Sequence, residues 1–195
     1  MMSPEAGLFF GLWLRKPLSI ASVYPSSRFL ADAFAGLTDL RRPGPVLELG
    51  AGTGSLTEGL LRAGCRPERL IILEREPALA RVLRRSFRTV TVLEADATKI
   101  AGALAAHGVT RLATVVSSLP IKWFSVEAQR AVIMPCLDLL GPAGKFLQVT
   151  NGFVSPVATH SLGIAGMEAR RVWRNLPPAQ IWAYTRPAST VSRGS

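Results

Sequence analysis

The feature that most constrains this chain is a short apolar run leading directly into closely spaced glycines. Residues 46–49 read Val-Leu-Glu-Leu, and Gly50, Gly52 and Gly54 follow before a helical pattern begins. A strand, a tight turn and a helix in this order bring bare backbone N–H groups to a ligand at the start of the helix. The dinucleotide fingerprint G-x-G-x-x-G requires a third glycine where Ser55 stands. The motif therefore predicts a nucleoside-type cofactor and disfavours nicotinamide, with a purely structural turn as the alternative.

The rest of the chain alternates short β-branched runs with longer helical patterns, which is typical of βαβ units. Strands are expected at residues 46–49, 70–73, 89–93, 112–117 and 145–150, and helices at 54–63, 77–87, 98–107 and 126–140. Two further strand-like segments, 167–175 and 180–184, are separated by only four residues, so they should pair as an antiparallel hairpin. The predicted fold is α/β, with a Rossmann-like, mostly parallel sheet and a C-terminal antiparallel hairpin.

Helical material is expected ahead of the first strand, in residues 1–40, with the α/β domain in residues 41–195. Ser26 or Ser27 is predicted to be the N-cap of a helix that follows it. Residues 1–40 are interpreted as a segment that docks on a membrane and covers the active site.

Two acidic residues follow the second and third predicted strands. Glu74 comes 20 residues after Gly54, where a carboxylate can accept hydrogen bonds from both hydroxyls of a ribose. Asp96 is expected either to accept a hydrogen bond from an adenine amine or to cap the next helix. Open α/β sheets bind ligands where the carboxyl ends of their strands meet. The predicted cofactor-binding residues are Glu48, Gly50, Ala51, Gly52, Gly54, Glu74, Arg75, Asp96, Ala97 and Ser117.

Glu48 and the loop after the fourth predicted strand complete the expected site. Glu48 is predicted to face the methionine part of the cofactor, or else to orient the glycine loop as a buried carboxylate. Backbone carbonyls in the loop at residues 117–124 would receive the hydrogens of an amine nucleophile and orient it. Trp123 and Phe124 are expected to stack on a base, to pack against a lipid or to be core residues. Lys122 is expected to bind a phosphate or to be solvated.

The charge balance of the chain favours an anionic partner. Lys and Arg number 23 against 13 Asp and Glu, a formal net charge of +10, which suits either nucleic acid or an anionic lipid surface. Cys65 and Cys136 have no metal-binding or redox spacing, so we interpret them as buried, reduced thiols and expect no metal.

An apolar run near the start of the chain is followed by basic residues. It is too short to span a membrane, and it predicts either a helix lying in the membrane interface or a helix covering its own domain. The predicted substrate- and membrane-contacting residues are Phe9, Phe10, Trp13, Arg15, Lys16, Lys122 and Trp123.

From residue 22 to residue 187 the sequence resembles the bacterial phospholipid N-methyltransferases, a soluble type within the class I S-adenosylmethionine-dependent superfamily. The residues that carry the resemblance lie in segments 23–30, 48–57, 115–120, 146–152, 173–179 and 181–184. The loop departs from the family, which usually has Gly at the position of Ser118 and Asn near Trp123.

The resemblance implies stepwise methylation of phosphatidylethanolamine toward phosphatidylcholine. S-adenosyl-L-methionine would be the cofactor and S-adenosyl-L-homocysteine the product. A cytoplasmic enzyme, peripherally associated with the inner face of the cell membrane, would dock through its N-terminal helix. By this resemblance Tyr24 lies near the reacting amine, and the predicted catalytic residues are Tyr24, Ser117 and Ser118.

Three rival functions stay open at this point. The first is that of the rRNA adenine N6-dimethyltransferases, which are similar through the same strands, but their loop has an Asn and an aromatic where this chain has Ser118 and Ile121. The sequence also ends after the hairpin, which leaves no room for a helical RNA-binding domain, so nucleic acid is not the expected partner. The second is methylation of a different amine-bearing lipid, such as an ornithine lipid, and the third is a non-catalytic, membrane-binding role. The oligomeric state is left open.

Overall fold

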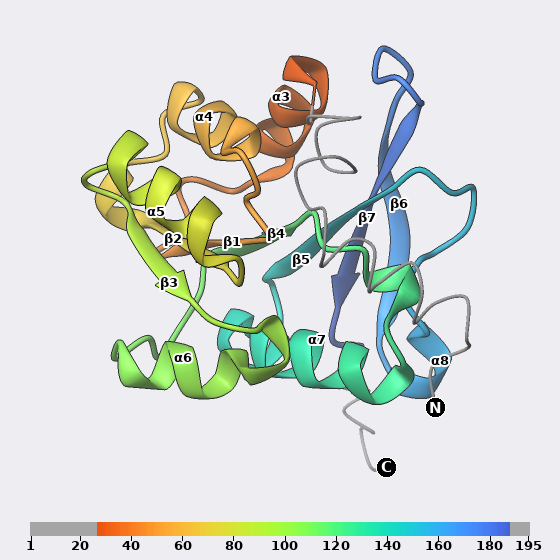
Figure 1. Cartoon of the computed structure of the whole chain (residues 1–195). Helices are drawn as coiled ribbons and strands as arrows, with labels where there is room; N and C mark the ends of the chain where they lie inside the picture. Colours follow the sequence, from red (N-terminus) through yellow and green to blue (C-terminus); the bar gives the residue numbers. More distant parts are fainter. Residues whose placement is uncertain (1–26, 188–195) are drawn as a thin grey trace.

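The computed structural model describes residues 27–187 as one α/β fold around a single seven-stranded sheet. The strand order is β3-β2-β1-β4-β5-β7-β6, with parallel pairing from β3 through β5 and antiparallel pairing of β7 with β5 and β6. The strands are β1 (Val46–Leu49), β2 (Leu70–Glu74), β3 (Thr91–Glu94), β4 (Thr114–Ser117), β5 (Lys145–Thr150), β6 (Ala165–Val172) and β7 (Ala179–Thr185) (Figure 1). The predicted sheet with its C-terminal hairpin is confirmed.

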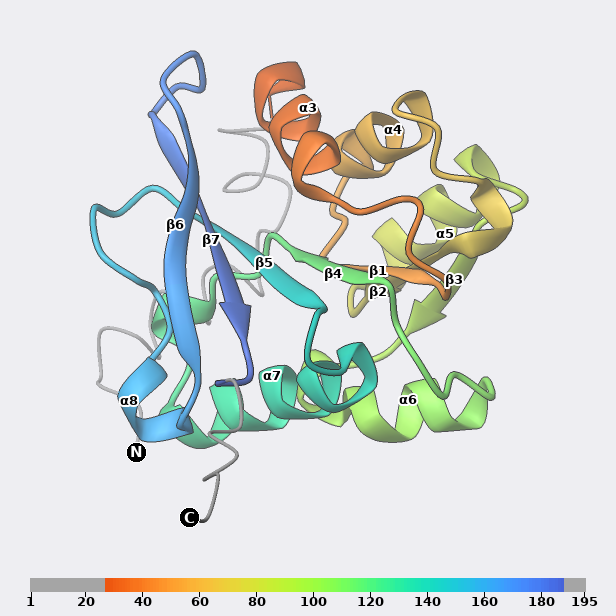
Figure 2. The ribbon, with the colours of Figure 1, turned by 180° about the vertical axis from the view of Figure 1, so that it is seen from behind.

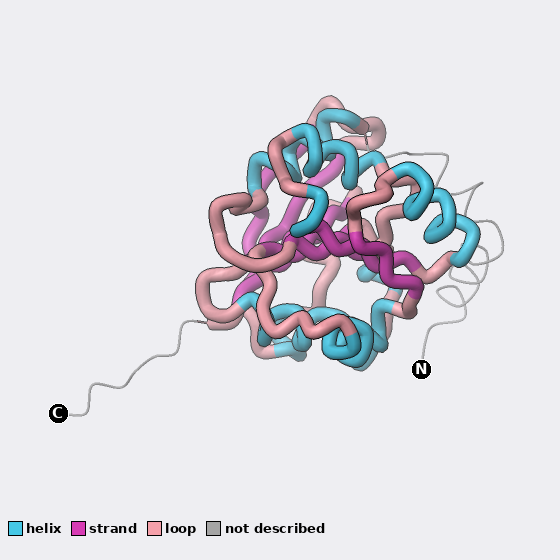
Figure 3. Tube along the Cα trace, turned by 90° about the vertical axis from the view of Figure 1, so that its left-hand side faces the viewer, coloured by secondary structure: helices cyan, strands magenta, loops and turns pink. Residues whose placement is uncertain are grey.

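Helices cover both faces of the sheet and make a three-layered molecule, seen with the sheet between two helical layers in Figure 3. One layer contains α3 (Arg28–Leu37), α4 (Ser55–Arg62) and α5 (Pro77–Ser86), and the other contains α6 (Ile100–Ala106) and α7 (Val126–Leu140), with the short α8 (Thr159–Leu162) beyond them (Figure 2). Each layer has its own hydrophobic core against the sheet. The central strands β1 and β2 are buried at every position, as expected for parallel strands covered on both faces.

The helix α3 belongs to the same core as the sheet. Its residues Leu30 and Phe34 are 4% and 1% exposed and pack in the cluster that contains Val46 of β1. Ser27 caps this helix, because its side chain accepts a hydrogen bond from the Leu30 N–H, and the prediction of a serine cap is confirmed. Residues 27–40 are therefore part of the domain, whereas residues 1–26 lie outside the described part of the chain.

One predicted helix is divided in the structure. In place of a helix over 98–107, a 3-10 turn (Ala97–Lys99) precedes α6, which begins at Ile100. Asp96 accepts hydrogen bonds from the Thr98 N–H and hydroxyl, at 2.9 and 2.7 Å, and this cap holds the tighter turn at the end of β3. The divided helix keeps the Asp96 side chain next to the sheet edge.

Both cysteines are buried, as the sequence predicted, and neither is in a disulfide. Within residues 27–187, no helix has the length and apolarity needed to span a bilayer. The same residues contain no cluster of His, Cys, Asp and Glu side chains suited to a metal ion.

Candidate cofactor and active site

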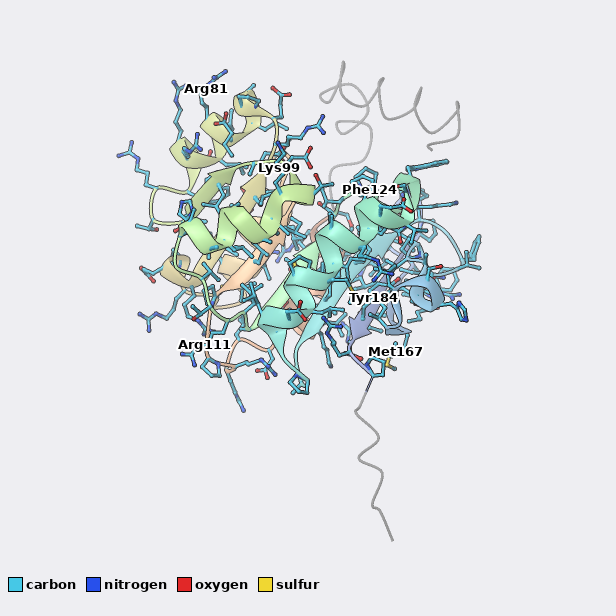
Figure 4. The ribbon with its side chains drawn as sticks, turned by 90° about the horizontal axis from the view of Figure 1, so that it is seen from below. Arg81, Lys99, Arg111, Phe124, Met167 and Tyr184 are labelled. Atoms are coloured by element: carbon cyan, nitrogen blue, oxygen red, sulfur yellow. The ribbon has the colours of Figure 1, made fainter. Side chains whose placement is uncertain are left out.

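The predicted cofactor-binding residues lie at the carboxyl edge of the parallel strands. The strand order reverses between β1 and β4, and a reversal of this kind opens a crevice at the strand ends. In Figure 4, Lys99 and Phe124, which follow β3 and β4, lie toward one end of the sheet, and Arg111, which precedes β4, lies toward the other. We call the first of these ends the carboxyl edge.

The loop after β1, which we call the glycine loop, has a backbone conformation that favours glycine. Gly50, Gly52 and Gly54 all have positive φ, at 74°, 57° and 91°. A Cβ on Gly50 would lie 2.8 Å from a methyl of Leu119, and a Cβ on Gly54 would lie 2.7 Å from the Phe87 ring. A Cβ on Gly52 would meet no atom within 4 Å, so this glycine faces open space. Close packing accounts for two of the glycines, and the third leaves open space in front of the loop.

Glu74, at the end of β2, is organised by the glycine loop. One carboxylate oxygen accepts the Gly52 N–H at 3.0 Å, and the other accepts the Glu76 N–H at 2.9 Å. The residue is only 6% exposed and lines a pocket. Each oxygen of an ionised carboxylate has a second lone pair, so the held carboxylate can still accept a hydrogen bond from each of two hydroxyls.

Asp96 forms an ion pair with Arg75 at 3.1 Å beside the same pocket. Partial burial raises the pKa of Asp96, but hydrogen bonds from Thr98 and Arg75 outweigh it, and the pKa is lowered overall. The carboxylate is therefore ionised at neutral pH and acts as an acceptor. Asp96 caps the 3-10 turn, which confirms the expected cap, and it also lines the pocket, while its hydrogen bond to an adenine amine stays a prediction.

The pocket has a volume of about 250 Å³ and combines polar groups with apolar walls. Its lining residues are Gly50, Leu73, Glu74, Arg75, Asp96, Ala97, Thr98, Leu119, Phe124, Ser125 and Ala128. Carboxylates beside flat apolar walls suit a nucleoside, because its sugar hydroxyls donate hydrogen bonds and its base packs between side chains. Gly50, Glu74, Arg75, Asp96 and Ala97 were predicted, whereas Ser125 and Ala128 at the start of α7 were not.

Glu48 is completely buried and does not line this pocket. One of its oxygens accepts the Thr57 hydroxyl hydrogen bond from α4 at 2.7 Å, and the other has no hydrogen-bond partner among the described residues. Burial raises the pKa of Glu48 to about 7, with a smaller contribution from the charge of Glu74. Glu48 is thus a buried carboxylate, as one of the two expectations had it, but its hydrogen-bond partner is on α4 rather than in the glycine loop. Thr57 had no sequence signal of its own.

The loop after β4 is fastened to the glycine loop. The Ser118 hydroxyl donates to the Gly50 carbonyl at 2.6 Å, and the Ser118 N–H donates to the Leu49 carbonyl at 3.1 Å. Ser117 is fully buried, and its hydroxyl accepts the Leu119 N–H at 3.4 Å. The Leu119 carbonyl accepts hydrogen bonds from Ile121 and from the Gln148 side chain. The amine contact predicted for this loop stays a prediction, and at least one of its carbonyls is already engaged.

The remaining predicted contacts separate into three groups. Phe124 lines the pocket, whereas Trp123 is 39% exposed and is therefore not a core residue. The Lys122 ammonium lies 5.5 Å from the centre of the Trp123 ring, at the surface beside the loop. Tyr24 and the predicted docking residues Phe9, Phe10, Trp13, Arg15 and Lys16 lie outside the described residues.

Comparisons with known proteins identify the superfamily. No protein-family model matches the chain. It is 35% identical over 148 residues to the ornithine lipid N-methyltransferase of Singulisphaera acidiphila, which covers 74% of this chain and 77% of that protein. It is 32% identical over 197 positions to the ribosomal RNA small subunit methyltransferase A of Anaeromyxobacter dehalogenans, which covers 91% of this chain and 66% of that protein. The chain thus spans slightly less than two thirds of that second relative.

A solved structure shares the fold. The glycopeptide N-methyltransferase MtfA complexed with S-adenosylmethionine has a TM-score of 0.61 at 19% identity, covering 82% of this chain and 94% of that one. With the sequence relatives and the site at the carboxyl edge, the family is clear. The chain belongs to the class I S-adenosylmethionine-dependent methyltransferases.

Proposed function

We propose that the protein methylates the amine of a membrane-lipid headgroup, with ornithine lipid as the favoured headgroup. The observation that carries this proposal is the 35% identity to an ornithine lipid N-methyltransferase of which the chain covers 77%. The formal net charge of +10 supports it, because it favours association with an anionic lipid surface.

The described residues fit the cofactor of this family. S-adenosylmethionine supplies a methyl group on a sulfonium, which is already activated toward an amine. Glu74 would hold the ribose hydroxyls and Asp96 the adenine amine, and the space in front of Gly52 leaves room for the rest of the cofactor. The protein's own contribution is to place the amine lone pair in line with the methyl group and to let the amine lose a proton.

Two features of the loop after β4 count against an RNA base as the acceptor. Ile121 stands where the rRNA enzymes have an aromatic residue, and it is 1% exposed, so it offers no surface for stacking. Ser118 stands where those enzymes have an amide, and its hydroxyl is committed to the Gly50 carbonyl. The same positions are compatible with a small aliphatic amine, which needs no stacking platform.

Phosphatidylethanolamine is a second candidate headgroup. The segments that resemble the phospholipid N-methyltransferases include the β6–β7 turn and the loop after β4, and both lie at the carboxyl edge. Ornithine lipid and phosphatidylethanolamine both present a primary amine at a membrane surface, so one site can be tested with both.

The test is transfer of label from methyl-labelled S-adenosylmethionine to defined acceptors. Phosphatidylglycerol vesicles would carry ornithine lipid, phosphatidylethanolamine or neither, and a parallel reaction would contain ribosomal RNA. We expect label in the ornithine-lipid vesicles and none in phosphatidylglycerol alone. Label only in phosphatidylethanolamine vesicles would change the headgroup, and label only in RNA would overturn lipid methylation.

A further inference from the structure

Two loops of the described chain expose large apolar side chains. In the loop after β5, Phe153 and Val154 are 81% and 69% exposed. In the turn between β6 and β7, Trp173 and Leu176 are 66% and 81% exposed. Single exposed apolar residues are common, but several of them gathered on neighbouring loops mark an interaction surface.

These two loops lie at one edge of the sheet. The last residue of β5, Thr150, pairs with Gln180 near the start of β7. The loop after β5 therefore begins at the same end of the sheet as the β6–β7 turn. Because β5 runs parallel to β4, this is the carboxyl edge that also contains the cofactor pocket. In Figure 2 the β6–β7 turn lies beside α3, and the loop after β5 extends to the side of the sheet before the chain reaches α8.

The start of α3 joins the β6–β7 turn. The Ser27 hydroxyl donates a hydrogen bond to the Asn175 side chain at 2.6 Å, and the Asn175 amide donates to the Pro177 carbonyl at 2.7 Å. Phe29 of α3 is 40% exposed, and the Arg174 guanidinium lies 4.2 Å from the centre of its ring. The turn is thus held in place by polar contacts while its apolar side chains face outward. We call Phe29, Phe153, Val154, Trp173 and Leu176 the carboxyl-edge patch.

Arginines accompany the aromatic members of the patch. Arg174 stacks on Phe29, and the Arg171 guanidinium lies 5.2 Å from the centre of the Trp173 ring. The Arg171 guanidinium donates to both Glu168 carboxylate oxygens, at 3.0 and 2.8 Å, so Arg174 is the arginine that would reach a lipid phosphate. Apolar side chains beside such an arginine suit the lipid interface, because the rings enter the hydrocarbon boundary while the guanidinium stays at the headgroups. Arginine and aromatic residues alone would equally suit RNA. The aliphatic Val154 and Leu176 favour lipid, since they cannot stack on bases.

We propose that the carboxyl-edge patch docks on an anionic lipid bilayer and turns the cofactor pocket toward the headgroups. This inference rests on the proposed function, because a lipid amine must reach the edge where the methyl group is held. Docking through two loops and the start of α3 fixes the orientation of the domain on the bilayer. The inference adds a second docking element to the N-terminal helix that the family resemblance implies.

The test compares two pairs of substitutions in the full chain. The patch variant carries Phe153→Ser and Leu176→Ser, the two most exposed members of the patch. The control variant carries Met167→Ser and Val82→Ser, which are 67% and 49% exposed. Met167 lies toward the opposite end of the sheet from Phe124 in Figure 4. Val82 lies on α5, which packs against β3 and β2, whereas β6 and β7 are at the other side of the sheet.

Binding would be measured by flotation with vesicles of phosphatidylglycerol and phosphatidylcholine, which contain no amine acceptor. We expect the patch variant to bind at least about tenfold more weakly than wild type, because two apolar side chains no longer enter the bilayer. The control variant should bind as wild type does. Both should bind S-adenosylhomocysteine with unchanged affinity, which shows an intact fold and cofactor site.

A labelling experiment gives a second, independent readout. Cys65 and Cys136 are buried, so an environment-sensitive thiol probe will react at a single introduced cysteine. With Leu176→Cys, vesicles should raise the probe's fluorescence and shift its emission to the blue. With Met167→Cys they should not.

Three outcomes would overturn the docking surface. The first is equal vesicle binding by the patch and control variants, and the second is unchanged probe fluorescence at position 176 when vesicles are added. The third is a patch variant that binds RNA more weakly than wild type but binds vesicles equally well. Because the vesicles contain no methyl acceptor, the binding result does not depend on whether the protein methylates a lipid.

Discussion

The role of Glu74 can be tested by replacing its carboxylate with an amide of the same shape. In Glu74→Gln, the amide oxygen can still accept one of the two backbone N–H groups, from Gly52 or Glu76. The amide nitrogen then faces the other N–H, so two donors meet and one bond of the glycine loop is lost. The variant also offers ribose hydroxyls a neutral acceptor instead of a charged one.

The magnitude follows from the two hydroxyl hydrogen bonds that Glu74 would accept. A hydrogen bond to a charged group contributes about 1 kcal/mol more than a neutral one, so two of them amount to about 2 kcal/mol. The dissociation constant for S-adenosylhomocysteine should therefore rise roughly 30-fold. Isothermal titration calorimetry would measure it, with circular dichroism and thermal unfolding to establish that the variant is folded.

Glu76→Gln is the matched control for this change. It removes the same charge two residues away, and the Glu76 side chain only caps α5, accepting the Ala78 N–H at 3.4 Å outside the pocket. Its affinity for S-adenosylhomocysteine should stay within about threefold of wild type. Equal affinities for the two folded variants would refute the ribose role of Glu74.

Three further substitutions test contacts that hold the fold together, at the site and at the opposite end of the strands. Gly54→Ala should destabilise the protein by about 2 kcal/mol in urea unfolding, because φ is 91° and the new Cβ would lie 2.7 Å from Phe87; an unchanged midpoint would contradict this. The raised pKa of Glu48, about 7 against an ordinary 4.5, means that the folded protein holds this proton more tightly than the unfolded chain. As the pH rises from about 4.5 to about 7, the free energy of unfolding of wild type should therefore fall by on the order of 3 kcal/mol relative to that of Glu48→Gln. A difference between the two proteins that does not depend on pH would contradict this. Arg69→Met removes hydrogen bonds to the carbonyls of Leu40, Arg42 and Gly44 and should lower the free energy of urea unfolding by about 2 kcal/mol. A variant as stable as wild type would show that these hydrogen bonds do not stabilise the fold.

Local patterns in the sequence were enough to predict the architecture. The strand beginning at Val46, the glycines after it and the acids at positions 74 and 96 each lie within or next to one βαβ unit. In such units, strand ends converge on one edge by geometry, so residues that follow consecutive strands are brought together whatever their side chains. The terminal hairpin followed from the four residues between its strands, too few for a helical crossover. For these elements the order of residues along the chain already determines which residues meet.

Contacts between distant segments were decided only by the tertiary structure. The pocket wall at Ser125 and Ala128 depends on where α7 begins against the sheet, and the capped turn after Asp96 depends on two hydrogen bonds that no periodicity encodes. Phe124 enters the pocket while its neighbour Trp123 is exposed, although the two are equally apolar in sequence. The burial of a side chain depends on which residues it contacts in the folded protein, and those residues are often far apart in the sequence. Residue order alone was thus enough to predict the sheet and to bring two acidic residues, Glu74 and Asp96, to the polar side of one pocket. The folded chain decided the apolar half and the exposed patch beside it.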